Sequence, residues 1–303
     1  MTSRFAAPAE LEDALALLAA DPAARPVAGG TDMVVAARQG RKELPESVVA
    51  IDRIPELGGH EIIEGALVLG GLTTHGWLAA SADVRAGWTA LADASSIVGS
   101  PATRWTGTIG GNLMNASPAA ETTAPLVVLD ASVTLNAAGG ASRTVPVADL
   151  ATGPGRTVAA QGELLTRVSI PTPAAGSGSA YIRLEYRRAM EIAIVGAAAL
   201  VTIDGGVVRD ARIALAAVAP TIVRAPEAEA ILHDAPATPE TFAAAGQAAA
   251  AAASPIDDVR ASADYRRAML AVVVARALSA AAARARGEAI PVPASRWAHG
   301  QEA

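Results

Sequence analysis

Two stretches decide the fold, Val27-Ala28-Gly29-Gly30-Thr31-Asp32 and Thr108-Ile109-Gly110-Gly111-Asn112. Each contains a glycine pair next to small polar residues. Glycine lets a backbone approach a bound anion closely, and free N–H groups at the start of a helix can hold that anion. One such pair is usually an ordinary turn. Two of them indicate the two walls of a single diphosphate site, held by backbone N–H groups without a lysine.

Other phosphate and catalytic motifs are missing from the sequence. Neither stretch follows the G-x-G-x-x-G pattern of a Rossmann dinucleotide site, and no Gly-Lys-Ser/Thr follows as a P-loop requires. The four histidines are scattered without metal-ligand spacing. No G-x-S-x-G segment supports a Ser–His–Asp triad. The sequence therefore predicts no catalytic side chain and no metal ligand in this chain.

The segment up to residue 55 is predicted to be a small unit of alternating strands and helices around the first glycine pair. A helix with a stripe of leucines ends at Asp21-Pro22. A second helix, Met33–Gln39, begins directly after the glycine turn, with Thr31 or Asp32 as its N-cap. The strands of this unit are predicted at Pro26–Ala28 and Val48–Ile51.

The middle of the chain mixes helices with strands, and the second glycine pair lies in a small-residue loop, Gly107–Asn115. Helices are predicted at Thr74–Ala80 and Trp88–Ile97. Strands are predicted at Ala66–Leu72, Val133–Asn136, Thr144–Val147 and Leu164–Ile170. The Pro- and Gly-rich run Pro171–Gly178 is the predicted linker to the last domain.

After the linker, strands come first and helices follow, which is typical of an α+β domain. Asp204-Gly205-Gly206 joins two of the strands as a hairpin turn. The last helix begins after Ser262 as N-cap and stops at Gly287. The predicted strands are Ala180–Arg187, Gly196–Ile203 and Val207–Ala217, and the helices are Pro226–Leu232, Pro239–Ala253 and Ser262–Arg286.

Composition limits the function classes. The 303 residues carry 24 Lys and Arg against 30 Asp and Glu, a net charge of −6, which argues against binding to nucleic acid phosphates. The chain has no cysteine, so it holds no disulfide and no Cys-ligated iron–sulfur cluster. The most apolar stretch, Ile192–Ile203, is about half of the ~20 residues that a bilayer needs. We expect no transmembrane segment and a cytoplasmic location.

Taken together, these stretches resemble the FAD-binding medium subunit of molybdenum hydroxylases, the family of carbon monoxide dehydrogenase and xanthine dehydrogenase. The resemblance extends over nearly the whole chain, with further matching segments at Gly70–Thr74, Ala116–Glu121, Gly162–Leu165, Glu191–Val195 and Asp258–Arg267. It implies an α+β chain with a two-subdomain FAD-binding fold of the vanillyl-alcohol-oxidase (PCMH) type. A C-terminal domain of a three-stranded antiparallel sheet with a helical bundle follows. The implied parts are residues 1–57 and 58–173 (FAD-binding subdomains 1 and 2), 178–287 (C-terminal domain) and 288–303 (tail).

The resemblance also implies which residues contact FAD. The two glycine segments would hold the diphosphate with Ala28, Gly29, Gly30, Thr31, Asp32, Met33, Thr108, Ile109, Gly110, Gly111 and Asn112. Ser117 and Glu121 correspond to positions near the ribose and adenine, and Ile192 to a position beside the isoalloxazine ring. Further contacts would come from Val98, Leu165 and Arg183. Relatives often have Asp at position 121 and some have Tyr at position 192, so this chain departs from them at both.

The implied function is electron transfer within a larger assembly. In this family a molybdopterin-molybdenum cofactor in a large subunit hydroxylates the substrate. Two [2Fe–2S] clusters in a small subunit relay electrons to FAD, which passes them to an external acceptor. The absence of cysteine fits, because the clusters must then belong to another chain. The family assembly is a dimer of heterotrimers, and we expect non-covalent FAD in this chain.

Two other functions stay open on the sequence alone. One is a stand-alone flavin oxidoreductase of the same fold, which would need its own substrate pocket and base. The other is a non-catalytic nucleotide-binding scaffold subunit, against which both intact glycine pairs argue.

Overall fold

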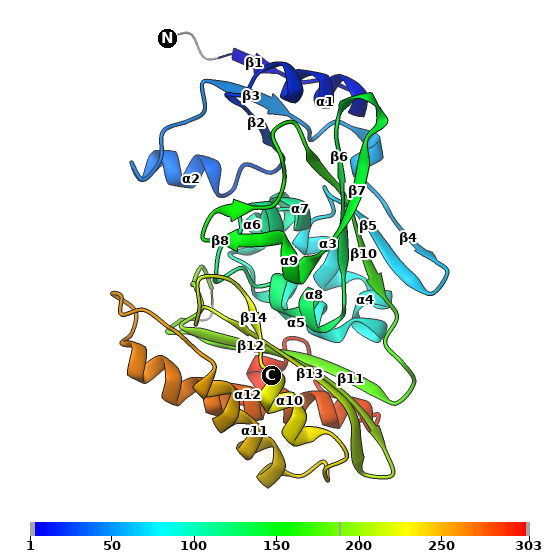
Figure 1. Cartoon of the computed structure of the whole chain (residues 1–303), viewed down its shortest axis with the longest axis vertical. Helices are drawn as coiled ribbons and strands as arrows, with labels where there is room; N and C mark the ends of the chain where they lie inside the picture. Colours follow the sequence, from blue (N-terminus) through cyan, green and yellow to red (C-terminus); the bar gives the residue numbers. More distant parts are fainter. Residues whose placement is uncertain (1–3, 188, 301–303) are drawn as a thin grey trace.

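The computed structural model describes residues 4–187 and 189–300, arranged as three stacked units (Figure 1). The first unit is a parallel three-stranded sheet in the order β1-β3-β2. Helix α1 covers it with the buried side chains of Ala14, Leu15 and Leu18. The elements are β1 (Arg4–Ala6), α1 (Leu11–Ala20), β2 (Ala24–Val27), α2 (Met33–Arg38), β3 (Ser47–Ala50) and the 3₁₀ turn η1 (Pro55–Leu57).

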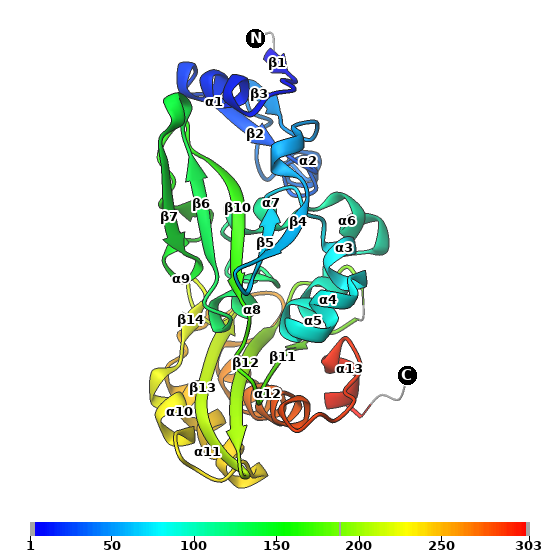
Figure 2. The same ribbon diagram turned by 90° about the vertical axis from the view of Figure 1, so that its right-hand side faces the viewer.

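The second unit is a five-stranded antiparallel sheet in the order β4-β5-β10-β6-β7, with a layer of short helices on one side (Figure 2). Its strands are β4 (His60–Ile63), β5 (Ala66–Gly70), β6 (Ser132–Asn136), β7 (Ser142–Pro146) and β10 (Leu164–Pro171). Its helices are α3 (His75–Ala80), α4 (Ala82–Gly87), α5 (Thr89–Ile97), α6 (Pro101–Thr106), α7 (Ile109–Met114), α8 (Thr123–Val128) and α9 (Val147–Leu150). The small elements are η2 (Ala138–Gly140), β8 (Ala151–Gly153) and β9 (Arg156–Thr157).

The third unit is an antiparallel sheet, β11-β12-β13-β14, whose two faces are both covered. Along β12, Ala197, Ala199 and Val201 pack toward the helices of this unit, while Ala198 and Leu200 pack toward the second unit. This explains the almost unbroken apolar run, since a strand buried on both sides has no polar face. The elements are β11 (Ser177–Leu184), β12 (Val195–Asp204), β13 (Val207–Ala216), β14 (Val223–Arg224), α10 (Pro226–Leu232), α11 (Pro239–Ala251), α12 (Ala263–Ala285) and α13 (Ala294–Ala298).

The C-terminal unit departs from the expectation in three details. A two-residue strand, β14, joins the three long strands predicted. The linker is shorter than Pro171–Gly178, because β10 continues to Pro171 and β11 begins at Ser177. Within the segment 288–303, predicted as a tail, α13 folds back onto β11, where the Ser295 hydroxyl accepts a 3.1 Å bond from the Arg183 N–H.

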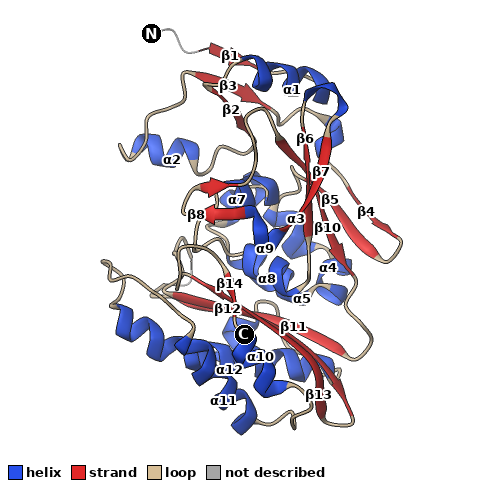
Figure 3. Ribbon diagram, viewed as in Figure 1, coloured by secondary structure: helices blue, strands red, loops and turns tan. Residues whose placement is uncertain are grey.

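One predicted loop is a helix. Gly107–Asn115 was expected to be irregular, yet α7 spans Ile109–Met114 (Figure 3). The Thr108 hydroxyl caps it by accepting a 3.1 Å hydrogen bond from the Gly111 N–H. An N-cap of this kind contributes about 1 kcal/mol, enough to offset much of the cost of one of the glycines in so short a helix. The strands β1 and β4 and the helices α4 and α6 also escaped prediction.

A buried carboxylate joins the second and third units. Asp93 on α5 is fully buried and accepts four hydrogen bonds from the C-terminal part of the chain. The Tyr181 N–H (3.1 Å), the Ala294 N–H (2.9 Å) and both terminal nitrogens of Arg284 (2.7 and 3.0 Å) are its donors. Every donor lies far along the chain, so Asp93 connects α5 to β11, α12 and the start of α13.

A second ion pair fixes the start of α12. Arg266 is 3 % exposed and donates to the backbone oxygens of Ile194 (2.5 Å) and Ala217 (3.1 Å). Its other terminal nitrogen lies 2.7 Å from Asp258 Oδ1. Partial burial works against ionisation of Asp258. The N–H of Arg260 and the Arg266 guanidinium nevertheless hold the pKa of this carboxyl below its usual value of 3.8.

We expect Asp258→Asn to lower the free energy of unfolding at pH 7 by about 1.5–3 kcal/mol, the range for hydrogen bonds to charged groups. Because the folded-state pKa is depressed, the wild-type contribution is complete above pH 3.8 and is lost as the pH falls below it. Urea titrations at pH 7 and pH 3 test this: the difference between variant and wild type should shrink at pH 3. Asp264→Asn, at an exposed carboxylate of α12, is the matched control, and equal effects of the two variants would contradict the prediction.

Helix α12 has the length and hydropathy of a membrane span, but it forms the centre of the third unit. It packs against β11, β12 and α11, and 56 % of its most apolar stretch is buried inside the protein. Leu270, Val274, Ala277 and Ala281, spaced to lie on one face of the helix, are all completely buried. Its hydropathy therefore reflects its place in a protein core.

Candidate functional site

The two glycine segments meet between the first and second units. A Cβ atom on Gly29 would lie 1.8 Å from the backbone oxygen of Thr106 and 3.2 Å from the N atom of Gly107. Only a residue without a side chain permits this approach. The contact places the first segment, Ala28–Met33, against the chain that leads into the second, Thr108–Asn112. The structure thus brings together the two stretches that the sequence predicted to share a site.

The second segment is fixed by the chain just after β5. The Gly110 N–H donates to the Gly71 oxygen and the Ile109 N–H to the Thr73 oxygen, both at 2.9 Å, while the His75 N–H donates to the Gly107 oxygen at 3.1 Å. A Cβ on Gly110 would lie 2.6 Å from the Gly71 oxygen. Gly110 is therefore a packing residue.

Free backbone N–H groups lie on the first segment and are absent at the start of the second. The first three N–H groups of α7 all bond inside the protein, the third to the Thr108 hydroxyl. Within residues 4–187 and 189–300, the N–H groups of the five residues Gly29–Met33 have no acceptor. Gly30 has φ +65°, a conformation that favours glycine and turns successive N–H groups to one side. The first segment thus presents N–H donors suited to an anion. The second segment, whose first N–H groups already bond inside the protein, contributes closely packed backbone to the junction.

Gly111 is the open position of the second segment. A Cβ there would meet only the Thr108 hydroxyl oxygen, at 3.0 Å, with no other heavy atom among its near contacts.

The prediction of an N-cap at Thr31 or Asp32 was half right. Asp32 occupies the N-cap position of α2, but no side chain caps this helix among the described residues.

Glu121 lies in a buried polar cluster. Its Oε1 accepts a hydrogen bond from Arg183 Nη1 (2.5 Å) and its Oε2 one from the Tyr181 hydroxyl (2.6 Å). Glu185 also pairs with Arg183. Burial raises the pKa of the Glu121 carboxyl, and Arg183 opposes that shift. Both carboxylate oxygens already bind protein donors, so a ribose contact, as predicted for Glu121, would use their remaining lone pairs.

Arg183 and Ile192 come together at this cluster. Arg183 Nη1 also reaches the Glu191 backbone oxygen at 3.3 Å, which ties the residue before Ile192 to β11. Burial of the Arg183 guanidinium is offset by Glu121 and Glu185, and the pKa of Arg183 is raised. Ile192 itself is 44 % exposed. The cluster therefore anchors the loop that carries Ile192, and the apolar side chain of Ile192 stays exposed to solvent.

The other predicted contacts come from several parts of the second unit. Leu165 is buried beside Gly71, where a Cβ on Gly71 would lie 2.7 Å from its oxygen. Asn112 Oδ1 accepts a 2.7 Å bond from the Thr122 hydroxyl. The Ser117 hydroxyl accepts a 3.3 Å bond from the Ala119 N–H. Val98 ends α5, and its oxygen accepts a 3.1 Å bond from Arg104.

Sequence reasoning missed Tyr181 and His75. Tyr181 is completely buried against Glu121, and no local motif marks it. His75 is 1 % exposed at the start of α3, beside Gly107. Its position directly after the matching segment Gly70–Thr74 is the sequence signal that could have found it. Among the described residues, no group of three or more His, Asp or Glu side chains is arranged to hold a metal ion.

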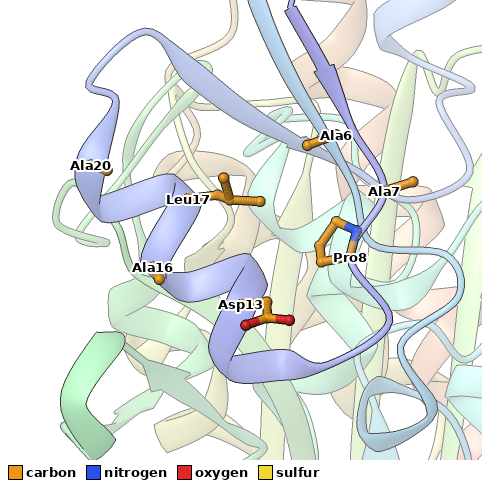
Figure 4. A pocket seen from close by; sticks show the side chains of 7 residues that line it. All are labelled: Ala6, Ala7, Pro8, Asp13, Ala16, Leu17 and Ala20. Atoms are coloured by element: carbon orange, nitrogen blue, oxygen red, sulfur yellow. The ribbon is translucent and has the colours of Figure 1, made fainter.

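A surface hollow of about 580 Å³ lies elsewhere, between β1 and α1 (Figure 4). It is lined by alanines with Pro8, Leu17 and Asp13. It is open and apolar, and it offers none of the N–H groups found on Gly29–Met33. The candidate site therefore remains the junction of the two glycine segments.

Comparisons with known proteins match this chain along most of its length. Residues 1–173 match the family model described as FAD binding domain in molybdopterin dehydrogenase, and residues 180–281 match CO dehydrogenase flavoprotein C-terminal domain. The carbon monoxide dehydrogenase medium chain of Hydrogenophaga pseudoflava is 34 % identical over 92 % of this chain and 97 % of its own length. The xanthine dehydrogenase FAD-binding subunit of Escherichia coli O157:H7 is 31 % identical over 92 % and 96 %.

Solved structures agree in fold. A carbon monoxide dehydrogenase from Hydrogenophaga pseudoflava that lacks the Mo-pyranopterin moiety superposes with a TM-score of 0.89 at 35 % identity. That alignment covers 94 % of this chain and 98 % of the other. Quinoline 2-oxidoreductase from Pseudomonas putida 86 gives 0.88 at 29 % identity, over 94 % and 98 %. The mixed α/β fold is thus the one found in these enzymes.

Proposed function

The chain belongs to the family of FAD-binding subunits of molybdopterin dehydrogenases, and on that basis we propose that it is the electron-transfer subunit of a heteromeric molybdenum hydroxylase. It is a flavoprotein and a subunit of an oxidoreductase. In the proposed role, its FAD receives electrons from [2Fe–2S] clusters of a partner subunit and passes them to an external acceptor.

The residues at the glycine junction fit a dinucleotide. The single observation that carries this proposal is the contact of Gly29 with Thr106, which places the free N–H groups of Gly29–Met33 beside the second segment. A run of such N–H groups is a concave, positively polarised surface that suits a diphosphate. Gly111 adds a wall without a side chain. The fit needs no lysine, in keeping with the acidic chain.

When bound, FAD supplies the redox chemistry, and this chain supplies position and electrostatics. The N–H groups of Gly29–Met33 would bind diphosphate oxygens, and Gly111 would let the cofactor approach α7. Arg183, which pairs with the carboxylates of Glu121 and Glu185, would bind the Glu191 backbone oxygen. This contact would place Ile192 beside the isoalloxazine ring. Val98, Ser117 and Leu165 are proposed as further contacts.

The proposed partners follow from what this chain lacks. With no cysteine, it cannot ligate an iron–sulfur cluster through thiolates, so we assign the iron–sulfur clusters of the proposed complex to another chain. We propose a small subunit with two [2Fe–2S] clusters and a large molybdopterin subunit, assembled as a dimer of heterotrimers in the cytoplasm. Within this chain we propose FAD-binding subdomains at 1–57 and 58–173 and a C-terminal domain at 178–287.

We expect the purified complex to contain about one FAD per copy of this chain, released by acid without covalent attachment. An absorption spectrum followed by chromatography of the released chromophore measures this, and metal analysis of the co-purified chains tests the partners. FMN, a covalent flavin, or a complex without flavin would reject the proposal. Turnover of a substrate by the isolated chain would instead support a stand-alone flavoenzyme.

A further inference from the structure

Strand β11 is the edge of its sheet, and side chains bind its outward backbone groups. In an antiparallel pair, alternate residues direct their N–H and C=O groups toward the neighbouring strand and away from it. Because β11 pairs with β12 on one side only, the outward groups of Ser179, Tyr181 and Arg183 face no strand. The Ser179 oxygen accepts a 2.6 Å bond from the Thr89 hydroxyl, and the Tyr181 N–H donates to Asp93 Oδ2 at 3.1 Å. The outward groups of Arg183 bond to a different element.

Helix α13 lies beside β11 (Figure 2) and binds both outward groups of Arg183. The Ser295 hydroxyl accepts the 3.1 Å bond from the Arg183 N–H, and His299 Nε2 lies 3.0 Å from the Arg183 oxygen. The His299 N–H donates to the Ser295 oxygen at 3.1 Å, so the two residues are one helical turn apart. Residues at this spacing lie on the same face of a helix. Two side chains of α13 thus hold one residue of β11 from its free side.

Arg276 on α12 determines which nitrogen of His299 carries the proton. Its Nη1 lies 2.6 Å from His299 Nδ1. A guanidinium has only donors, so Nδ1 must be the acceptor of this bond. The ring proton then resides on Nε2, from which it is donated to the Arg183 oxygen. Arg276 therefore orients the imidazole for its bond to β11.

The side chain of Arg183 leads from this contact to the loop that carries Ile192. Arg183 Nη1 donates to Glu121 Oε1 at 2.5 Å and to the Glu191 backbone oxygen at 3.3 Å. The side chain of Arg183 is completely buried, so it has little room to move independently of its backbone. A shift of the Arg183 backbone would therefore displace the bond to Glu191, and with it Ile192.

We propose that Ser295 and His299 are positioning residues for the flavin site, which act by holding the backbone of Arg183. Through Arg183, they keep the Glu191 backbone oxygen and Ile192 in place. This inference rests on the proposed function, because it takes Ile192 as a neighbour of the isoalloxazine ring. Neither Ser295 nor His299 touches the cofactor in this role.

The test uses the full chain, purified in the complex in which it is expressed. Ser295→Ala removes the acceptor of the Arg183 N–H, and His299→Leu removes the donor to the Arg183 oxygen. We expect each variant to weaken FAD binding about 2- to 10-fold, the range for the loss of one neutral hydrogen bond. We also expect both to lose the fine structure that contact with an apolar side chain gives to the flavin absorption band. Flavin fluorescence measures the dissociation constant, and an absorption spectrum measures the second effect.

Conservative variants separate positioning from simple packing. His299→Gln keeps an N–H donor near the position of Nε2, whereas His299→Asn places its amide near Nδ1, away from the Arg183 oxygen. The Gln variant should therefore keep the FAD affinity and the absorption band of wild type, and the Asn variant should not. Arg296→Ala is the matched control on α13, because this side chain is exposed, and it should leave both measurements unchanged.

FAD affinity and an absorption band equal to wild type in folded Ser295→Ala and His299→Leu variants would overturn the inference and leave the proposed function intact. Equal losses in His299→Gln and His299→Asn would overturn it as well, because packing alone would then explain the effect. If His299→Leu fails to fold, the comparison of the Gln and Asn variants decides. A wild-type complex without flavin would overturn the proposed function itself.

Discussion

Asp93→Ala lowers the free energy of unfolding by about 3–5 kcal/mol, the cost expected when one partner of a buried ion pair is removed. The carboxylate is fully buried, and the side chain of its partner Arg284 is only 7 % exposed. The alanine leaves that guanidinium charged and buried without its acid. The N–H groups of Tyr181 and Ala294 lose their acceptor as well. A urea titration of the variant should show a clearly lower midpoint than wild type.

A matched control shows whether the loss of stability is specific to Asp93 or follows from the removal of any carboxylate. Asp83 lies on the neighbouring helix α4, where it is exposed. Asp83→Ala should change the free energy of unfolding by no more than about 0.5 kcal/mol, as surface substitutions usually do. Equal urea midpoints for the two variants would refute the assigned role of Asp93.

Gly111→Arg should abolish FAD binding while the chain stays folded. The added Cβ has one near contact, the Thr108 hydroxyl oxygen at 3.0 Å, and the fold can accept it because this side-chain atom needs to move by only a few tenths of an ångström. The length of the new side chain then fills the space beside α7 in which we place the diphosphate. We expect the dissociation constant for FAD to rise at least about 100-fold, equivalent to about 2.8 kcal/mol. Flavin content of the purified complex measures the loss of FAD binding, and a circular dichroism spectrum shows whether the chain stays folded.

The neighbouring glycines supply the controls. Gly87→Arg adds the same side chain at the end of α4, with nothing within 4 Å, and should leave flavin content unchanged. Gly110→Ala should disturb the fold instead, because its Cβ would lie 2.6 Å from the Gly71 oxygen. Full flavin content in a folded Gly111→Arg variant would show that the cofactor does not lie against the second segment.

Elements marked by apolar spacing, a cap or a turn could be predicted from the sequence, and elements that depend on distant contacts could not. Apolar spacing and a Ser262 cap are enough to identify α12, and Gly205-Gly206 with positive φ identifies the β12–β13 hairpin. By contrast, α7 contains two glycines and has little intrinsic helix preference. It forms because the Thr108 side chain caps it and because Thr73 and Gly71 accept its first N–H groups. Those acceptors lie in a distant part of the sequence, so no local pattern reveals the helix.

The candidate site, like the fold, could be predicted from the sequence only in part. The glycine pairs are visible in the sequence, but their different tasks are not. Gly29 and Gly110 are required for backbone packing, whereas a Cβ on Gly111 would meet only the Thr108 hydroxyl oxygen, and only the neighbouring atoms distinguish these glycines. Glu121 was predicted as a position near the FAD ribose and adenine, and nothing in the sequence shows that Tyr181 and Arg183, about 60 residues later, bind both its oxygens. Pairing across such separations depends on how the units stack.

The four bonds to Asp93 also set an order for synthesis on the ribosome. Its donors lie 88, 191 and 201 residues downstream, so the last of them, Ala294, is made long after α5 itself. Until then the nascent FAD-binding half carries a carboxyl group that should face its interior. That half can collapse early, but α5 can reach its final position only after Ala294 has left the exit tunnel. Completion of the flavin-binding half therefore waits for the synthesis of the third unit, even though its own residues emerge first.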